Sequence, residues 1–122
     1  MSFDHVLVEV EKAEKETAEL CSKLVQFNSA HPEGRTDECV GFIKDYFDRH
    51  GIETEIHSAN PLKPNIVARI QGAEERKILW VGHLDVVPEG EADNWTYPPY
   101  SGKITDDEFI HGRGSSNMKN AC

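Results

Sequence analysis

A histidine and an aspartate two positions apart are the residues of this chain best suited to metal chemistry. His83 and Asp85 follow an apolar run, and this spacing places both side chains on one face if the backbone continues as a strand. A neutral imidazole binds zinc well, and a nearby carboxylate fixes its tautomer. Taken alone, however, a His-x-Asp pair is a weak signal, because most such pairs are only polar surface.

A glycine-rich segment nearer the end of the chain strengthens the signal. Gly112 and Gly114 permit backbone conformations that are closed to other residues, and Ser115 and Ser116 are suited to begin a helix. A tight connection between elements requires the same residues, and the phosphate-loop pattern is missing. The segment therefore predicts a sharp turn, which is either a plain connection or part of a site.

Two helices are expected to support these segments. Apolar residues between positions 5 and 27 recur at intervals of three and four, which is the period of an amphipathic helix. A second helix is predicted from an N-cap at Thr36 to a stop at His50 and Gly51. Its buried face is predicted to hold Cys39, Phe42, Ile43, Tyr46 and Phe47.

Strands are predicted between and after the helices. Alternating polarity indicates a strand at residues 52–57. A second strand is predicted at residues 65–70 after a turn, and a continuous apolar run indicates a third strand at 77–81 that is buried on both faces. Residues 88–102 form a long loop, and residues 103–111 form a short hairpin. Helices interleaved with strands favour a layered α/β fold.

Composition excludes several classes of function. The chain has 122 residues and a net charge of −9, which disfavours nucleic acid and anionic lipid as partners. No apolar run approaches the roughly 20 residues of a membrane span, and the acidic N-terminus does not resemble a secretory signal. We therefore expect a soluble, cytoplasmic protein whose three cysteines are thiols: Cys21 and Cys39, which are expected to be buried, and Cys122.

Together, the segments resemble one protein family. The sequences GHLDVVP (82–88), PPYS (98–101) and HGRGSSNMK (111–119) are similar in order and spacing to those of the dinuclear zinc amidohydrolases and metallopeptidases, which include acetylornithine deacetylase, succinyl-diaminopimelate desuccinylase, aminoacylases and related dipeptidases. The resemblance extends back through PNIVAR (64–69). It implies that residues 1–122 form the N-terminal, incomplete segment of a three-layer α/β catalytic domain with a mixed sheet flanked by helices. The smaller dimerisation or lid domain and the C-terminal half of the catalytic domain would be absent.

The resemblance also implies roles for individual residues. His83 matches the first metal-ligand histidine of the family, and Asp85 matches the catalytic-site acid that supports it. Asn117 occupies the position of the aspartate that bridges two zinc ions. The general-base glutamate and the remaining ligands of the family lie further along the chain than Cys122, so none can be assigned.

Two departures from the family pattern bear on activity. A bridging carboxylate offers an anionic oxygen to each of two cations, whereas the amide of Asn117 is neutral and has one acceptor oxygen. We therefore expect no zinc or one, either because the dinuclear site is disabled or because a single ion persists in a relaxed geometry. Asn120 replaces a glycine that is common in the family and raises a question only about local packing.

Two functions of different classes are consistent with these residues. In the first, the chain is part of a zinc-dependent hydrolase that cleaves amide bonds of N-acyl amino acids or small peptides, and is inactive alone. In the second, it is a non-catalytic truncated remnant or interaction module with at most weak binding of one metal. Neither involves nucleic acid or a membrane, and formation of a homo-oligomer stays open.

Several other side chains are given plainer interpretations. His111 adjoins the glycine turn and is a weaker site candidate, and Trp95 and Tyr100 are predicted to anchor the long loop. The histidines without partners at ligand spacing are interpreted as surface residues: His5, His31, His50 and His57.

Overall fold

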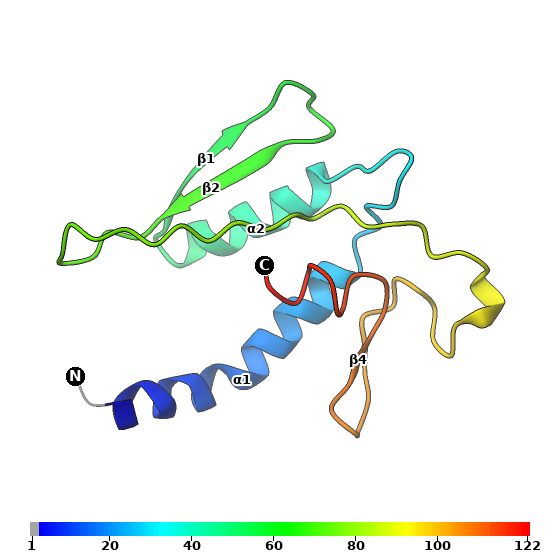
Figure 1. The fold of residues 1–122 in the computed structure, drawn as a ribbon, viewed down its shortest axis with the longest axis horizontal. Helices are drawn as coiled ribbons and strands as arrows, with labels where there is room; N and C mark the ends of the chain where they lie inside the picture. Colours follow the sequence, from blue (N-terminus) through cyan, green and yellow to red (C-terminus); the bar gives the residue numbers. More distant parts are fainter. Residues whose placement is uncertain (1–2) are drawn as a thin grey trace. The chain divides into compact units, whose positions relative to one another are not determined.

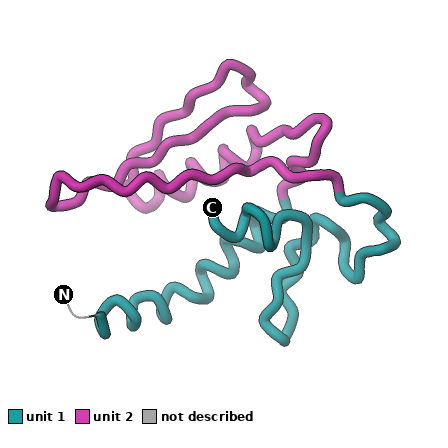
Figure 2. Tube along the Cα trace, viewed as in Figure 1, with its two compact units in different colours: residues 1–26, 89–121 teal, residues 27–88, 122 magenta. Residues whose placement is uncertain are grey.

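The computed structural model describes residues 3–122, so the first two residues of the predicted segment 1–122 lie outside it. It contains two α-helices, one 3-10 helix and two small antiparallel sheets (Figure 1). The chain forms two compact units (Figure 2), one of residues 3–26 and 89–121 and the other of residues 27–88 with Cys122. The mixed α/β composition predicted from the sequence is confirmed.

The first unit is built on the C-terminal part of helix α1, Phe3–Val25. Its buried apolar residues, Cys21, Leu24 and Val25, cluster in the last turns, where α1 contacts strand β4. Strands β3 (Lys103–Ile104) and β4 (Ile110–His111) form the predicted hairpin. The long loop before them contains the 3-10 helix η1, Ala92–Asn94.

The second unit packs helix α2, Asp37–Arg49, against the hairpin of strands β1 (Glu53–His57) and β2 (Asn65–Arg69). Thr36 precedes the helix, as predicted, although its side chain makes no capping hydrogen bond. The helix ends at Arg49 with His50 as its C-cap, and Gly51 follows with a positive φ of 68°, which is the conformation expected of a helix-stop glycine. Of the face that the sequence predicts to be buried, Cys39 is buried, as is the adjacent Val40. The other members of that face are half-buried: Phe42, Ile43, Tyr46 and Phe47.

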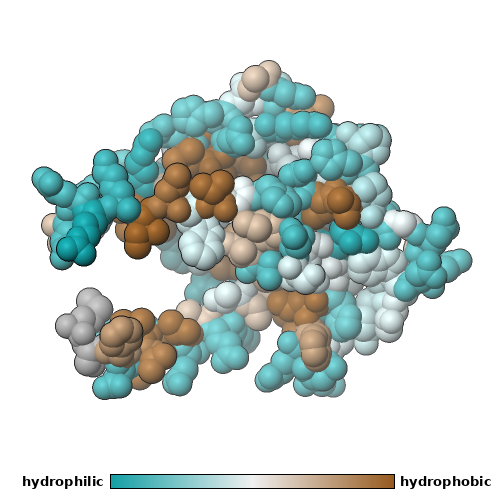
Figure 3. Space-filling view, in the orientation of Figure 1, coloured by the Kyte–Doolittle hydropathy of each residue, from teal (hydrophilic) through white to brown (hydrophobic). Residues whose placement is uncertain are grey.

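The prediction of a doubly buried strand at residues 77–81 is wrong for this structure. The segment has no strand assignment, and Ile78 and Leu79 are 95% and 85% exposed. A strand is defined by hydrogen bonds to a neighbouring strand, and neither two-stranded sheet includes this segment. Its apolar character therefore contributes to the hydrophobic surface visible in Figure 3 instead of to a core.

Two further expectations differ from the structure. The predicted helix beginning at Ser116 is a series of turns, because hydrogen bonds such as Ser115 N to Gly112 O and Asn117 N to Gly114 O span only three residues. The implied three-layer arrangement is not seen within residues 3–122, where each sheet has two strands.

Within residues 3–122, no helix is both long enough and apolar enough to cross a membrane.

Candidate functional site

The His83 imidazole and the Asp85 carboxylate lie together in the second unit. Nδ1 of His83 is 3.0 Å from the backbone oxygen of Asp85 and 3.3 Å from its Oδ1 atom. Both oxygens are acceptors, so the imidazole carries its proton on Nδ1 when neutral. This tautomer leaves the lone pair on Nε2, the form of histidine that binds a metal.

The backbone around Asp85 is fixed by a segment that precedes helix α2. Ala30 and Val86 form a parallel bridge, in which His31 N donates to Val86 O and Val86 N donates to Ser29 O, each at 3.1 Å. The buried hydroxyl of Ser29 also donates to Leu84 O at 2.6 Å. The residues on both sides of Asp85 are therefore held by direct hydrogen bonds.

His31 is a site neighbour that the sequence interpretation missed. Its Nε2 atom lies 2.8 Å from Oδ2 of Asp85, and this hydrogen bond is the main reason why the pKa of Asp85 lies below its usual range. The two residues are 54 positions apart, so no local pattern reveals their contact. The classification of His31 as a surface residue was correct for its half-exposed side chain but overlooked its partner.

Asn117 lies in the first unit, on the turns that follow β4. Gly112 and Gly114 have positive φ angles of 148° and 94°, which confirms the sharp turn predicted from the glycines. A Cβ atom on Gly112 would overlap Val25 Cγ1 and lie 2.9 Å from Pro99 O. The turn is thus closely packed at its base, while Asn117 itself is exposed.

The long loop is organised around Glu89, next to which the side chains of Trp95, Tyr100 and Arg113 gather. Trp95 Nε1 donates to the Glu89 backbone oxygen at 3.0 Å, and the Tyr100 hydroxyl donates to Glu89 Oε2 at 2.8 Å. The Arg113 guanidinium stacks 5.0 Å from the Trp95 ring centre. These contacts anchor the loop as predicted, and they connect it to the Gly112 turn through Arg113.

Three of the other histidines have structural contacts. His111 packs against the Tyr97 ring, with 4.8 Å between ring centres, and its Nε2 atom lies 3.4 Å from the Thr105 hydroxyl oxygen. His50 Nδ1 contacts the Tyr46 backbone oxygen, and His57 contacts Glu55. These contacts explain the three side chains without a ligand.

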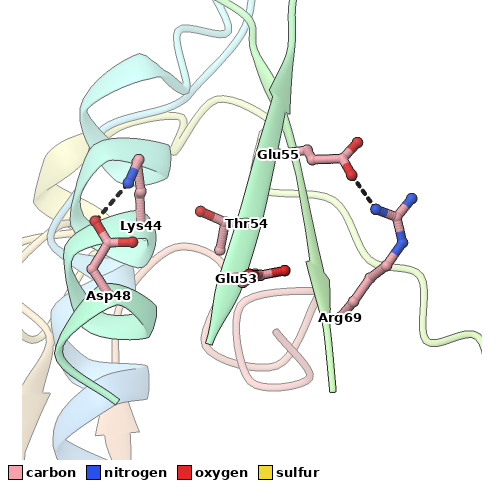
Figure 4. A pocket seen from close by; sticks show the side chains of 6 residues that line it. All are labelled: Lys44, Asp48, Glu53, Thr54, Glu55 and Arg69. Carbon is pink, nitrogen blue, oxygen red and sulfur yellow. Dashed lines mark hydrogen bonds and ion pairs between the residues drawn. The ribbon is translucent and has the colours of Figure 1, made fainter. Parts of the chain in front are cut away.

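A hollow of about 320 Å³ lies between α2 and the β1–β2 hairpin. Two ion pairs line it, Lys44 with Asp48 and Arg69 with Glu55 (Figure 4), and Glu53 adds a third carboxylate. Thr54 points from β1 toward the helix, whereas His83, Asp85 and Asn117 take no part. The hollow is therefore separate from the residues that the sequence selects.

The donor groups fit zinc in kind but not in number. Imidazole nitrogen and carboxylate oxygen are zinc ligands, and a complete structural or catalytic site needs three or four of them. Among residues 3–122, no group of three or more histidine, cysteine or acidic side chains converges in a way that could hold a metal ion. His83 and Asp85 provide two of the groups that such a site requires.

The segment that contains these residues matches a known protein family. The model of "Peptidase family M20/M25/M40" matches residues 79–122, which include both the His83–Asp85 pair and the Gly112 turn. The chain belongs to this family of metallopeptidases and deacylases.

Curated relatives extend the match over most of the chain. A probable succinyl-diaminopimelate desuccinylase from Staphylococcus aureus is 37% identical over 107 residues, which cover 88% of this chain and 25% of the relative. The succinyl-diaminopimelate desuccinylase of Hydrogenovibrio crunogenus is 36% identical over 106 residues, or 87% of this chain and 27% of the relative. An N-formyl-4-amino-5-aminomethyl-2-methylpyrimidine deformylase from Halalkalibacterium halodurans is 28% identical, with 96% of this chain and 28% of the relative covered. The chain therefore spans about a quarter of the length of these relatives.

Proposed function

We propose that this chain contributes part of the centre of a zinc-dependent hydrolase that cleaves amide bonds of N-acyl amino acids or small peptides. The observation that carries the proposal is the geometry of His83, whose Nδ1 faces Asp85 and whose Nε2 is left to bind a metal. The named relatives, two desuccinylases and a deformylase, remove acyl groups from nitrogen. They support the substrate class without specifying the substrate.

In this proposal His83 is a metal ligand, Asp85 is the supporting acid, and Asn117 stands where the family resemblance implies a bridging aspartate. Zinc, when bound, polarises a carbonyl group and lowers the pKa of an attacking water. Asp85 keeps the proton of His83 on Nδ1. The amide of Asn117 has one neutral acceptor oxygen and lacks the charge that a bridging aspartate supplies. We therefore expect the chain to bind no more than one zinc ion.

We further propose that residues 1–122 are the first part of a larger three-layer catalytic domain. The exposed apolar side chains of residues 78–81 support this arrangement, because additional strands beside them would bury the segment and complete its hydrogen bonds. In that larger sheet, residues 77–81 would form the strand that the sequence predicts.

Activity assays of the purified chain and of the full product of its reading frame test this proposal. With zinc present, we expect the chain alone to release no acyl group from N-acetyl or N-succinyl amino acids, because it gathers too few metal ligands. Where the reading frame extends beyond Cys122, the proposal requires zinc-dependent hydrolysis by the longer product. Turnover by the 122-residue chain would contradict the predicted inactivity, and an inactive longer product would contradict the assignment as a hydrolase.

A non-catalytic interaction module is the second candidate. Two observations favour it. The neutral side chain of Asn117 weakens a metal site, and the exposed apolar segment at residues 78–81 is suited to self-association. Sedimentation and zinc calorimetry on the same sample test this candidate. A monomer without zinc affinity would remove it.

A further inference from the structure

We draw no further inference here: the strongest candidate, the exposed apolar segment at residues 78–81 of the second unit, carries none, because nothing within residues 3–122 shows whether a further strand of the same domain or a second copy of the chain covers it.

Discussion

The regions around Asp85 and Asn117 both resemble the family in their backbone, but they differ in the side chain that each presents. Asp85 retains its acidic side chain together with hydrogen bonds from His31 and a bridged backbone. Asn117 follows a glycine turn that is closely packed at its base, but its side chain is a neutral amide. In the first region both scaffold and side chain suit a metal site, whereas in the second only the scaffold does.

Ancestry and activity are therefore supported by different features of the chain. Backbone turns are maintained by packing, since Gly112 has no room for a larger residue whatever the function of the turn. A ligand that bridges two cations, in contrast, depends on the charge of its side chain. Resemblance in the glycine turn therefore supports membership of the family, and only the side chains at positions 83, 85 and 117 bear on metal binding.

Substitution of Gly112 should have the largest effect on the Asn117 region. In Gly112→Ala, the new Cβ would overlap Val25 and crowd the Pro99 carbonyl, at a φ of 148° that disfavours L-residues. Overpacking and backbone strain together predict a loss of about 3 kcal/mol in the free energy of unfolding, measured by urea denaturation.

Gly41 provides the matched control for this substitution. It lies inside α2 with nothing within 4 Å of a new Cβ, so Gly41→Ala should be neutral or stabilise the chain by up to about 1 kcal/mol. Equal effects at Gly112 and Gly41 would show that the turn is not packed as described.

The Asp85 region should respond to loss of the Ser29 hydroxyl. Ser29 is fully buried and donates to Leu84 O, so Ser29→Ala leaves that carbonyl without this donor and should cost about 2 kcal/mol in unfolding free energy. Hydrogen exchange of the Val86 amide should also accelerate, because the bridge to residue 29 loosens.

Ser58 offers a control with the same chemistry in an exposed setting. Its hydroxyl donates to Asn60 O at 2.5 Å, where water replaces the lost partner. Ser58→Ala should therefore change the unfolding free energy by less than about 0.5 kcal/mol. A loss at Ser58 as large as that at Ser29 would argue against a special role for the backbone bridge around Asp85.

The loop that supports the Asn117 turn should show a smaller effect, which depends on pH. Burial, followed by the hydrogen bond to Glu89, raises the pKa of Tyr100 to about 12 from an ordinary value of 10.0. The folded state thus holds this proton more tightly, so the stability that it contributes is present below pH 10 and is lost as the pH rises toward 12.

The tyrosinate absorbance of the unaltered chain, minus that of Tyr100→Phe, measures this titration directly. The difference should have its midpoint well above pH 10. A midpoint at the ordinary value would show that Tyr100 and Glu89 are not joined, and that the loop is less well anchored than the Asp85 region.

Local patterns in the sequence predicted the elements whose stability is local. The apolar periods of both helices, the stop at Gly51 and the two strands predicted between residues 52 and 70 all correspond to observed elements. Residues 77–81 could not be predicted in this way. Their apolar run indicates burial, but a strand forms only where another strand supplies hydrogen bonds, and the sequence of the segment does not contain that information.

In the candidate site, too, local features could be predicted from the sequence and a long-range contact could not. His83 and Asp85 are close in sequence, so a contact between them is expected even though residues 82–85 are not a strand, and the turn at Gly112 follows from its glycines. The contact of His31 with Asp85 depends on the bridge between residues 30 and 86, which joins distant parts of the chain. Only the folded backbone reveals it.

Zinc binding to the 122-residue chain and to its Asn117→Asp variant tests the central claim most directly. Calorimetry and native mass spectrometry would give the affinity and the number of bound ions, with His83→Ala as the control that should abolish binding. Because the new carboxylate supplies the missing charge, we predict at most one zinc in the unaltered chain, and a gain of at least about tenfold in affinity, or about 1.4 kcal/mol, in Asn117→Asp. Two tightly bound ions in the unaltered chain, or no gain in the variant, would contradict the account.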